Sequence, residues 1–278
     1  MKGYLIYNRA EALRNKFFIS QLIGECTARG ASLELLIEEE LEMHLDTCFA
    51  VFRKGITLPI PDFVIARSQN YTLSRHFELM GVRVFNSSRV CLTCNDKMLT
   101  YQLACSLSLP VQETVLCPAD STPVCPLPFP CVIKPRDGKG GLDVLLAECS
   151  ADYERIRERF AGRVMLCQAL ADKGQDTRFY VMGGEVVCAF TRISDSDFRS
   201  NFCLGGRAIP HIPTPEELHI VESLCAALSP DYVGIDIIYR DGSPVFNEIE
   251  DTVGARMVYA NTDINMAGLF IERVISAL

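Results

Sequence analysis

Three carboxylates near the carboxy terminus have the types and spacing of a metal site. The stretch 232–256 reads YVGIDIIYRDGSPVFNEIEDTVGAR and contains Asp236, Glu248 and Glu250. Its two apolar, β-branched runs are separated by the turn residues RDGS, which predicts a hairpin of two strands. Side chains alternate along a strand, so Glu248 and Glu250 share one face, and the hairpin brings Asp236 beside them.

Acids held this close repel one another unless a cation lies between them. Carboxylate oxygens together with nucleotide phosphates suit Mg²⁺, and the same oxygens accept Mn²⁺. The alternative is a hairpin whose acids are solvated or matched to arginines, since acids on strands are common at exposed faces.

A glycine-rich stretch, FPCVIKPRDGKGGLDVLLAE, follows a proline-rich segment. It predicts a strand ending at Lys134, a loop with Gly138, Gly140 and Gly141, and a second strand. Glycines let the backbone approach phosphate oxygens, and the lysines add positive charge. The GKS or GKT of a Walker loop is missing, so an ordinary hairpin turn is the alternative.

Arginines gather in the next two stretches. GQDTRFYVMGGEVVCAFTRIS predicts a hairpin with Asp176, Arg178 and Arg192, and DFRSNFCLGG adds Arg199 and Asn201. Planar guanidinium groups suit triphosphate oxygens or a phosphoryl group in transfer. The alternative is that they pair with nearby aspartates on the surface.

Two further features fit a nucleotide site. Residues 164–170 form an apolar strand whose edge could bond an adenine ring. A helix over about 95–107 carries Lys97 in its first turn, where a cation is electrostatically unfavourable. Lys97 is therefore either solvated or in contact with an anion.

Composition and charge restrict the class of protein to which this chain can belong. The chain has 278 residues, 49% of them hydrophobic and 22% charged, and a net charge of −8. These values are typical of a globular protein and argue against a dedicated nucleic-acid surface. Neither a membrane span nor the apolar core of a signal peptide is recognisable, so we expect a cytoplasmic protein.

Cysteine and histidine usage gives little support to other centres. The 13 cysteines are an odd number spread through apolar segments, which predicts reduced thiols in the core. Cys91 and Cys94 form a CxxC without a second pair, and the four histidines are scattered, so a zinc set is not expected.

The order of predicted elements indicates two domains. Residues 1–92 alternate strand and helix, which predicts a small parallel sheet, and they contain no GxGxxG turn. A proline-rich segment over 110–130 is the best linker candidate. We expect the second domain, 93–278, to divide into a central lobe over about 115–170 and a carboxy-terminal lobe over about 171–278.

The motifs in this order resemble the RimK-type ATP-grasp ligases: NDK, VIKP with a glycine loop, GQDTR, DFRSN with GG, VGID and NEIE. The resemblance covers nearly the whole chain. It implies an α/β protein, α+β in the ATP-binding lobes, with a small parallel-sheet domain preceding an ATP-grasp domain. The implied reaction is phosphorylation of a carboxylate by ATP, followed by attack of an amine on the acyl phosphate to form an amide.

The resemblance also assigns roles to residues. The residues implied to bind ATP are Lys97, Lys134, Gly138, Gly141, Gln168, Ala169, Leu170, Asp176, Arg178, Arg199 and Asn201. Those implied to act on the reacting groups are Arg192, Arg199 and Arg256. Those implied to hold Mg²⁺ or Mn²⁺ are Asp236, Glu248 and Glu250.

The sequence departs from the family at three places. The family usually has asparagine where this chain has Glu250, and proline and glycine where it has Val253 and Gly254. Asp143 stands where the glycine loop usually has its last glycine. These differences keep two other functions open, a module that binds ATP without turnover and a small-molecule kinase.

The substrates implied are a small-molecule or peptide carboxylate and an amine, with no nucleic acid and no membrane. Candidate contacts to them are Arg67, Ser68, Gln69, Asn70, Asp251, Thr252 and Arg256, with Arg256 the best placed for a substrate carboxylate. An amphipathic helix over 264–278 allows a homo-oligomer.

Overall fold

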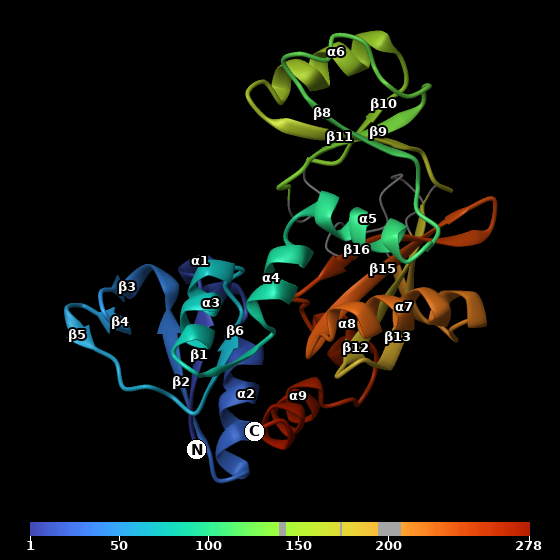
Figure 1. The fold of residues 1–278 in the computed structure, drawn as a ribbon. Helices are drawn as coiled ribbons and strands as arrows, with labels where there is room; N and C mark the ends of the chain where they lie inside the picture. Colours follow the sequence, from blue (N-terminus) through green and yellow to red (C-terminus); the bar gives the residue numbers. More distant parts are fainter. Residues whose placement is uncertain (139–142, 173, 194–206) are drawn as a thin grey trace.

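The amino-terminal domain is built on a parallel sheet of order β2-β1-β6-β7, in a computed structural model that describes residues 1–138, 143–172, 174–193 and 207–278 (Figure 1). Its strands are β1 (Lys2–Tyr7), β2 (Ser32–Ile37), β6 (Phe63–Ala66) and β7 (Arg83–Phe85). Its helices are α1 (Arg9–Arg14), α2 (Lys16–Ala28) and α3 (Tyr71–Leu79). The predicted parallel sheet is confirmed.

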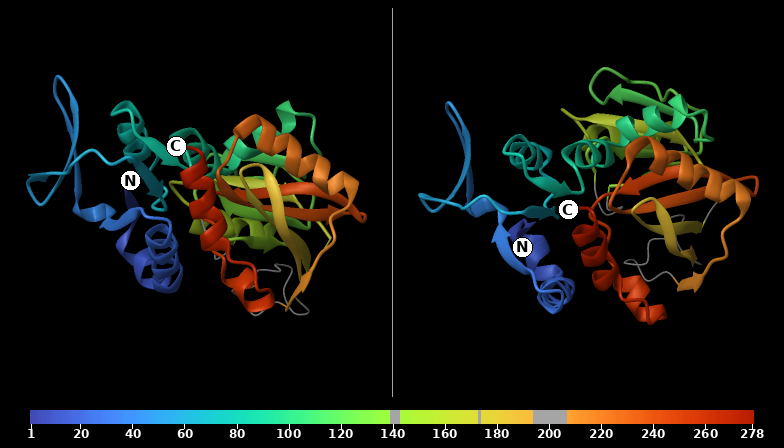
Figure 2. Two further views of the ribbon diagram at one scale, coloured as in Figure 1. Left: turned by 90° about the horizontal axis from the view of Figure 1, so that it is seen from below. Right: turned by 60° about the horizontal axis from the view of Figure 1, so that its bottom comes forward.

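A small antiparallel sheet that the sequence reading missed lies beside this domain. It consists of β3 (Leu41–Leu45), β4 (Phe49–Arg53) and β5 (Ile56–Thr57), preceded by the 3-10 turn η1 (Glu38–Glu40). The three strands extend outward from the body of the protein in every view (Figures 1 and 2). These strands have five, five and two residues, too few for periodicity to mark them in the sequence.

Two helices lead from this domain to the central lobe, namely α4 (Ser88–Cys94) and α5 (Lys97–Ser106). The lobe is an antiparallel sheet of order β10-β9-β11-β8, with α6 (Ser150–Arg159) packed on it. Its strands are β8 (Thr114–Pro118), β9 (Cys131–Pro135), β10 (Leu145–Ala147) and β11 (Val164–Ala169). The proline-rich segment is thus more than a linker, because it contains β8, which pairs along its length with β11.

The carboxy-terminal lobe is an antiparallel sheet of order β14-β13-β12-β15-β16. Its strands are β12 (Gln175–Met182), β13 (Glu185–Ile193), β14 (Arg207–Pro210), β15 (Tyr232–Arg240) and β16 (Ser243–Glu250). The helices that follow or interrupt it are α7 (Pro215–Leu228), α8 (Arg256–Asn261) and α9 (Met266–Ser276). Both predicted hairpins are confirmed.

The two faces of this sheet are covered by different parts of the chain. One face packs on α7 through a core that includes Phe179, Ile235 and Leu224. The other face shares a core with α9 and with α2 of the amino-terminal domain, which come side by side in Figure 1. The apolar face of α9 that suggested an oligomer is therefore buried within the chain.

In the described residues, none of the helices combines the length and the apolar character needed to cross a membrane.

Candidate active site

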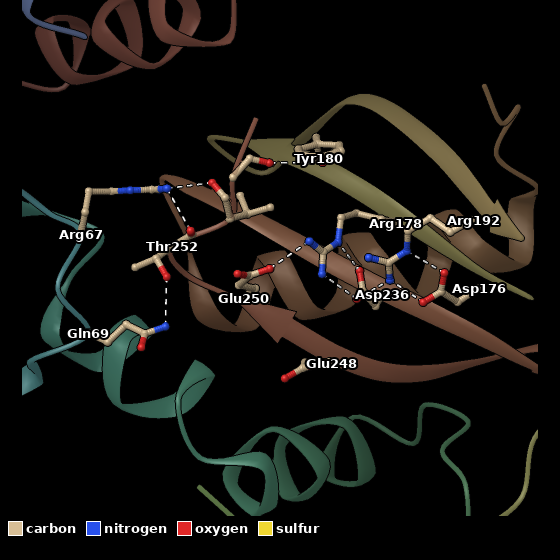
Figure 3. A network of polar contacts seen from close by, with 12 residues as sticks. Arg67, Gln69, Asp176, Arg178, Tyr180, Arg192, Asp236, Glu248, Glu250 and Thr252 are labelled. Atoms are coloured by element: carbon tan, nitrogen blue, oxygen red, sulfur yellow. Dashed lines mark hydrogen bonds and ion pairs between the residues drawn. The ribbon is translucent and has the colours of Figure 1, made fainter. Parts of the chain in front are cut away.

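Four charged side chains lie together on the face of the carboxy-terminal sheet opposite α7, as Figure 3 shows. Arg178 donates from Nε to Asp236 Oδ1 at 2.7 Å and from a terminal nitrogen to Oδ2 at 2.8 Å. Arg192 donates to the same Oδ2 at 2.7 Å and also forks onto Asp176, with its Nε 2.7 Å from Oδ1. We call Asp176, Arg178, Arg192 and Asp236 the charged face.

Strand register explains why these four residues meet. Asp176 of β12 lies directly opposite Arg192 of β13, and Arg178 lies directly opposite Asp236 of β15. Opposed residues point to the same side of a sheet, so one alternation places two acids and two arginines on one face. The middle strand, β12, contributes one residue to each pair.

Burial makes the pairing strong. Asp236 and Arg192 are each only 3% exposed, and Asp176 is 5% exposed. Burial by itself would raise the pKa of Asp236, but Arg178 and Arg192 outweigh it and hold that pKa well below its usual range. For Asp176, burial outweighs the neighbouring Arg192, so its pKa is raised. One acid is thus firmly ionised, and the other holds its charge less firmly.

The other two acids of the predicted metal site also contact cations. Glu250 lies 3.0 Å from a terminal nitrogen of Arg178, and Glu248 lies 3.0 Å from Lys97 Nζ. Their side chains are 36% and 41% exposed, unlike that of Asp236. The alternative of acids matched to arginines therefore describes Asp236 and Glu250 in this structure.

The hairpin geometry behind the metal prediction is present. Asp236 pairs directly with Glu248 across β15 and β16, and Glu250 lies opposite Gly234. Within the described ranges, however, no group of three acids, histidines or cysteines is arranged to hold a metal ion. A carboxylate offers about four lone-pair positions. Asp236 already uses three of them on guanidinium groups.

Helix α5, which lies between the two lobes in Figure 1, carries Lys97 and contacts Lys134. Lys97 Nζ donates to the Gly138 carbonyl at 2.7 Å and to Glu248, so it meets an anion instead of being solvated. Lys134 of β9 is buried and donates to Tyr101 of α5 at 2.9 Å and to Gln168 of β11 at 3.0 Å. The lysines thus join the carboxy-terminal hairpin, α5 and the central sheet.

The loop after β16 is tied to the amino-terminal domain by contacts that the sequence did not predict. Arg67 donates to the carbonyls of Thr252 and Val253 at 2.9 and 2.7 Å, as Figure 3 shows in part. Asn86 donates to the Asp251 carbonyl at 3.0 Å. Arg67 was predicted to contact substrate, but in the structure it is buried and binds the backbone of this loop.

The remaining predicted residues are distributed unevenly. Gly141, Arg199 and Asn201 lie outside the described residues. Ala169 ends β11, and its amide donates to the Glu113 carbonyl at 2.9 Å. Leu170 follows it and is half-buried. Arg256 begins α8 and is exposed.

Comparisons with known proteins agree with this architecture. Residues 94–274 match the family model described as a RimK-like ATP-grasp domain. The chain is 29% identical to a probable alpha-L-glutamate ligase 2 of Shewanella denitrificans, over 93% of this chain and 91% of that protein. It is also 29% identical to the ribosomal protein bS6–L-glutamate ligase of Salmonella schwarzengrund, over 88% and 87%.

A solved structure extends the likeness to the whole fold. The RimK domain protein ATP-grasp from Sphaerobacter thermophilus superposes with a TM-score of 0.77 at 18% identity, over 98% of this chain and 99% of that one. The resemblance seen in the motifs is therefore confirmed, and the chain belongs to the RimK-like ATP-grasp family of ligases.

Proposed function

We propose that this ligase binds ATP between its central and carboxy-terminal lobes and joins a carboxylate to the amine of an amino acid. The observation that carries the proposal is that Lys97, Arg178 and Arg192 contact the cross-strand acids. Helix α5, which carries Lys97, also holds Lys134 of the central lobe. Cations so placed offset the charge of a phosphoryl group in transfer. The glutamate ligases among the relatives make glutamate the first amine to test.

The chemistry balances in two steps. A carboxylate oxygen attacks the γ-phosphorus of ATP, giving an acyl phosphate and ADP. The amine then attacks the acyl carbon, phosphate leaves, and the amine loses a proton as the amide forms. Arg178 and Arg192 would face the phosphoryl oxygens, because each presents planar donors already held in place by Asp236.

The fit of Mg²⁺ or Mn²⁺ differs among the three acids. Glu248 and Glu250 are partly exposed, and Glu248 contacts Lys97 while Glu250 contacts Arg178, so both side chains can turn toward a metal ion. Asp236 has little coordination capacity left beside its two arginines. We propose that the two glutamates hold the ion and that Asp236 mainly fixes the arginines. Bound there, the ion would neutralise charge on the nucleotide phosphates.

The decisive experiment measures ADP release with ATP, glutamate and a peptide that ends in a free carboxylate, omitting each component in turn. Release that requires both acid and amine, with a hydroxamate when hydroxylamine replaces the amine, supports a ligase. ATP binding without release under any combination would indicate a binding module. Release without hydroxamate, together with a phosphorylated hydroxyl compound, would indicate a kinase.

One substitution distinguishes a role of Glu248 in metal binding from a role in stabilising the fold. Glu248→Gln removes a partly exposed charge, so we expect turnover to fall on the order of 100-fold while the melting temperature stays within a few degrees. Glu222→Gln, on the exposed side of α7, makes the same chemical change away from the site and is the matched control. Equal activity of the two variants across a range of Mg²⁺ concentrations would contradict the assignment.

A further inference from the structure

On the face of the sheet that carries α7, five polar side chains close a ring of hydrogen bonds. Glu217 Oε2 lies 2.7 Å from His211 Nε2, and His211 Nδ1 lies 2.9 Å from Thr191 Oγ1. Thr191 Oγ1 lies 3.3 Å from Thr177 Oγ1, which lies 2.7 Å from the Tyr239 hydroxyl. That hydroxyl reaches Glu217 Oε1 at 2.5 Å. We call these residues the His211 ring.

The ring lies directly behind the charged face. Thr177 stands between Asp176 and Arg178 on β12, and Thr191 precedes Arg192 on β13, so alternation turns both threonines to the opposite side. Both threonines are buried, and the Glu217 side chain is only 1% exposed. The elements that carry Asp176, Arg178 and Arg192 are therefore held from behind by this ring.

The ring also fixes the start of α7. The backbone amide of Thr214 donates to Glu217 Oε2 at 2.8 Å, and the Thr214 hydroxyl accepts from the Glu217 amide. This reciprocal pair is a capping box. Glu217 is thus the common member of the helix cap and the ring.

A count of hydrogens shows that the ring needs a donor at both nitrogens of His211. It has five links, and each link needs one hydrogen. The three hydroxyl groups and a neutral imidazole supply about four hydrogens, and an ionised carboxylate supplies none. The ring is therefore complete only when the Glu217–His211 pair carries one further proton, which makes its net charge zero.

Hydrogen-bond geometry places that proton on the imidazole. Glu217 accepts hydrogen bonds at both oxygens, and although burial opposes its charge, the bonds from His211, Thr214 and Tyr239 lower its pKa. The imidazole of His211 also makes an edge-to-face contact with the ring of Phe179.

Other titratable groups act on the ring less directly. Asp176 influences it through Tyr239 from the other side of β12. Glu216, His219 and Glu222 of α7 are exposed, and so is Arg207 on β14. Cys225 of α7 is buried, and burial raises the pKa of its thiol.

We infer that His211 is a positioning residue of the ligase reaction, which through the ring holds β12, β13, β15 and the start of α7 together behind the charged face. His211 directly follows β14, which ends at Pro210. Arg199 and Asn201 lie in the sequence between Thr191 of β13 and His211, two members of the ring. The effect on turnover rests on the proposed function, whereas the hydrogen bonding of His211 does not.

The proton is tested by nitrogen NMR of the full-length protein at pH 7, with His211→Gln used to assign the signal and the exposed His219 as internal reference. We expect protons on both ring nitrogens of His211 in the native protein. We expect loss of the Nδ1 proton in Thr191→Val, and its return in Thr191→Ser. A single neutral tautomer of His211 in the native protein would overturn the inference.

The positioning role is tested by steady-state ATP turnover. We expect Thr191→Val to lower kcat about 5- to 10-fold with little change in the KM for ATP, because the site still forms but is held less firmly. Thr191→Ser keeps the hydroxyl and should restore kcat. A native kcat in Thr191→Val would overturn the positioning role. Native protein that shows the protonated ring but no turnover would instead contradict the proposed function.

Discussion

Buried charges are compensated in different ways on the two faces of the carboxy-terminal sheet. On the charged face, two arginines contact three acids, Asp176, Asp236 and Glu250, and the cluster continues toward the exposed side through Glu250. On the α7 face, the His211 ring joins one carboxylate to one imidazole through hydroxyl groups and closes on itself.

We propose that this difference separates a face that binds a phosphoryl group from a face that only supports it. A guanidinium has five N–H donors, so Arg178 and Arg192 keep capacity for a phosphoryl group after binding their acids. Each hydroxyl in the ring has one hydrogen, and every one is used within it. We therefore expect substitutions on the charged face to have larger effects than substitutions in the ring.

The largest effect is expected for Arg192→Met. The change leaves Asp176 and Asp236 buried with less compensation, and removal of one partner from a buried pair costs about 3–5 kcal/mol. Urea unfolding measures this loss. Arg192→Lys keeps the charge but not the planar pair of donors, so its free energy of unfolding should lie between those of the native protein and Arg192→Met. A loss below about 1 kcal/mol in Arg192→Met would contradict the comparison.

The next effect concerns Asp251, which directly follows β16. Burial raises the pKa of Asp251 to about 6, although Asn95 donates to its Oδ1 at 3.0 Å. The folded state thus holds the proton more tightly than the unfolded state, whose pKa is near 3.8, so this group makes stability fall as pH rises from about 4 to 6.

Asp251→Asn should remove this slope and add up to about 3 kcal/mol at pH 7. Unfolding curves at pH 4, 5, 6 and 7 measure it. An unchanged slope in the variant would show that Asp251 is not the group responsible.

A smaller effect is expected in the ring. Glu217→Gln keeps the shape of the side chain but replaces an ionised acceptor of three hydrogen bonds, which should cost about 1–3 kcal/mol. Glu222→Gln on the same helix is exposed and should stay within about 0.5 kcal/mol of the native protein. Equal stability of the two variants would remove the distinction between the ring and the surface.

The smallest effect is expected outside both faces. Arg155 pairs with Asp152 within α6, and its side chain is 77% exposed. Exposed pairs contribute about 0–1 kcal/mol, so Arg155→Ala should change the unfolding free energy by less than about 1 kcal/mol. A loss as large as that of Arg192→Met would show that burial does not decide these values.

The sequence by itself determined which elements form and which side chains share a face. Periodicity and turn residues located the hairpins with Arg178, Asp236 and Glu248, because alternation along a strand is a local property. The order of motifs indicated the family. Short strands such as β3 to β5 and β8 were missed, because a few residues give too weak a local pattern to identify a strand.

Only the tertiary structure decided which partner each charge meets. Lys97 and Glu248 are 151 residues apart in the chain, and Arg67 reaches Thr252 across 185. The sequence predicts Asp236 as a metal ligand, yet in the structure both of its carboxylate oxygens accept hydrogen bonds from arginines. Strand register and domain packing set such contacts, and both depend on the whole chain, so no local pattern contains them.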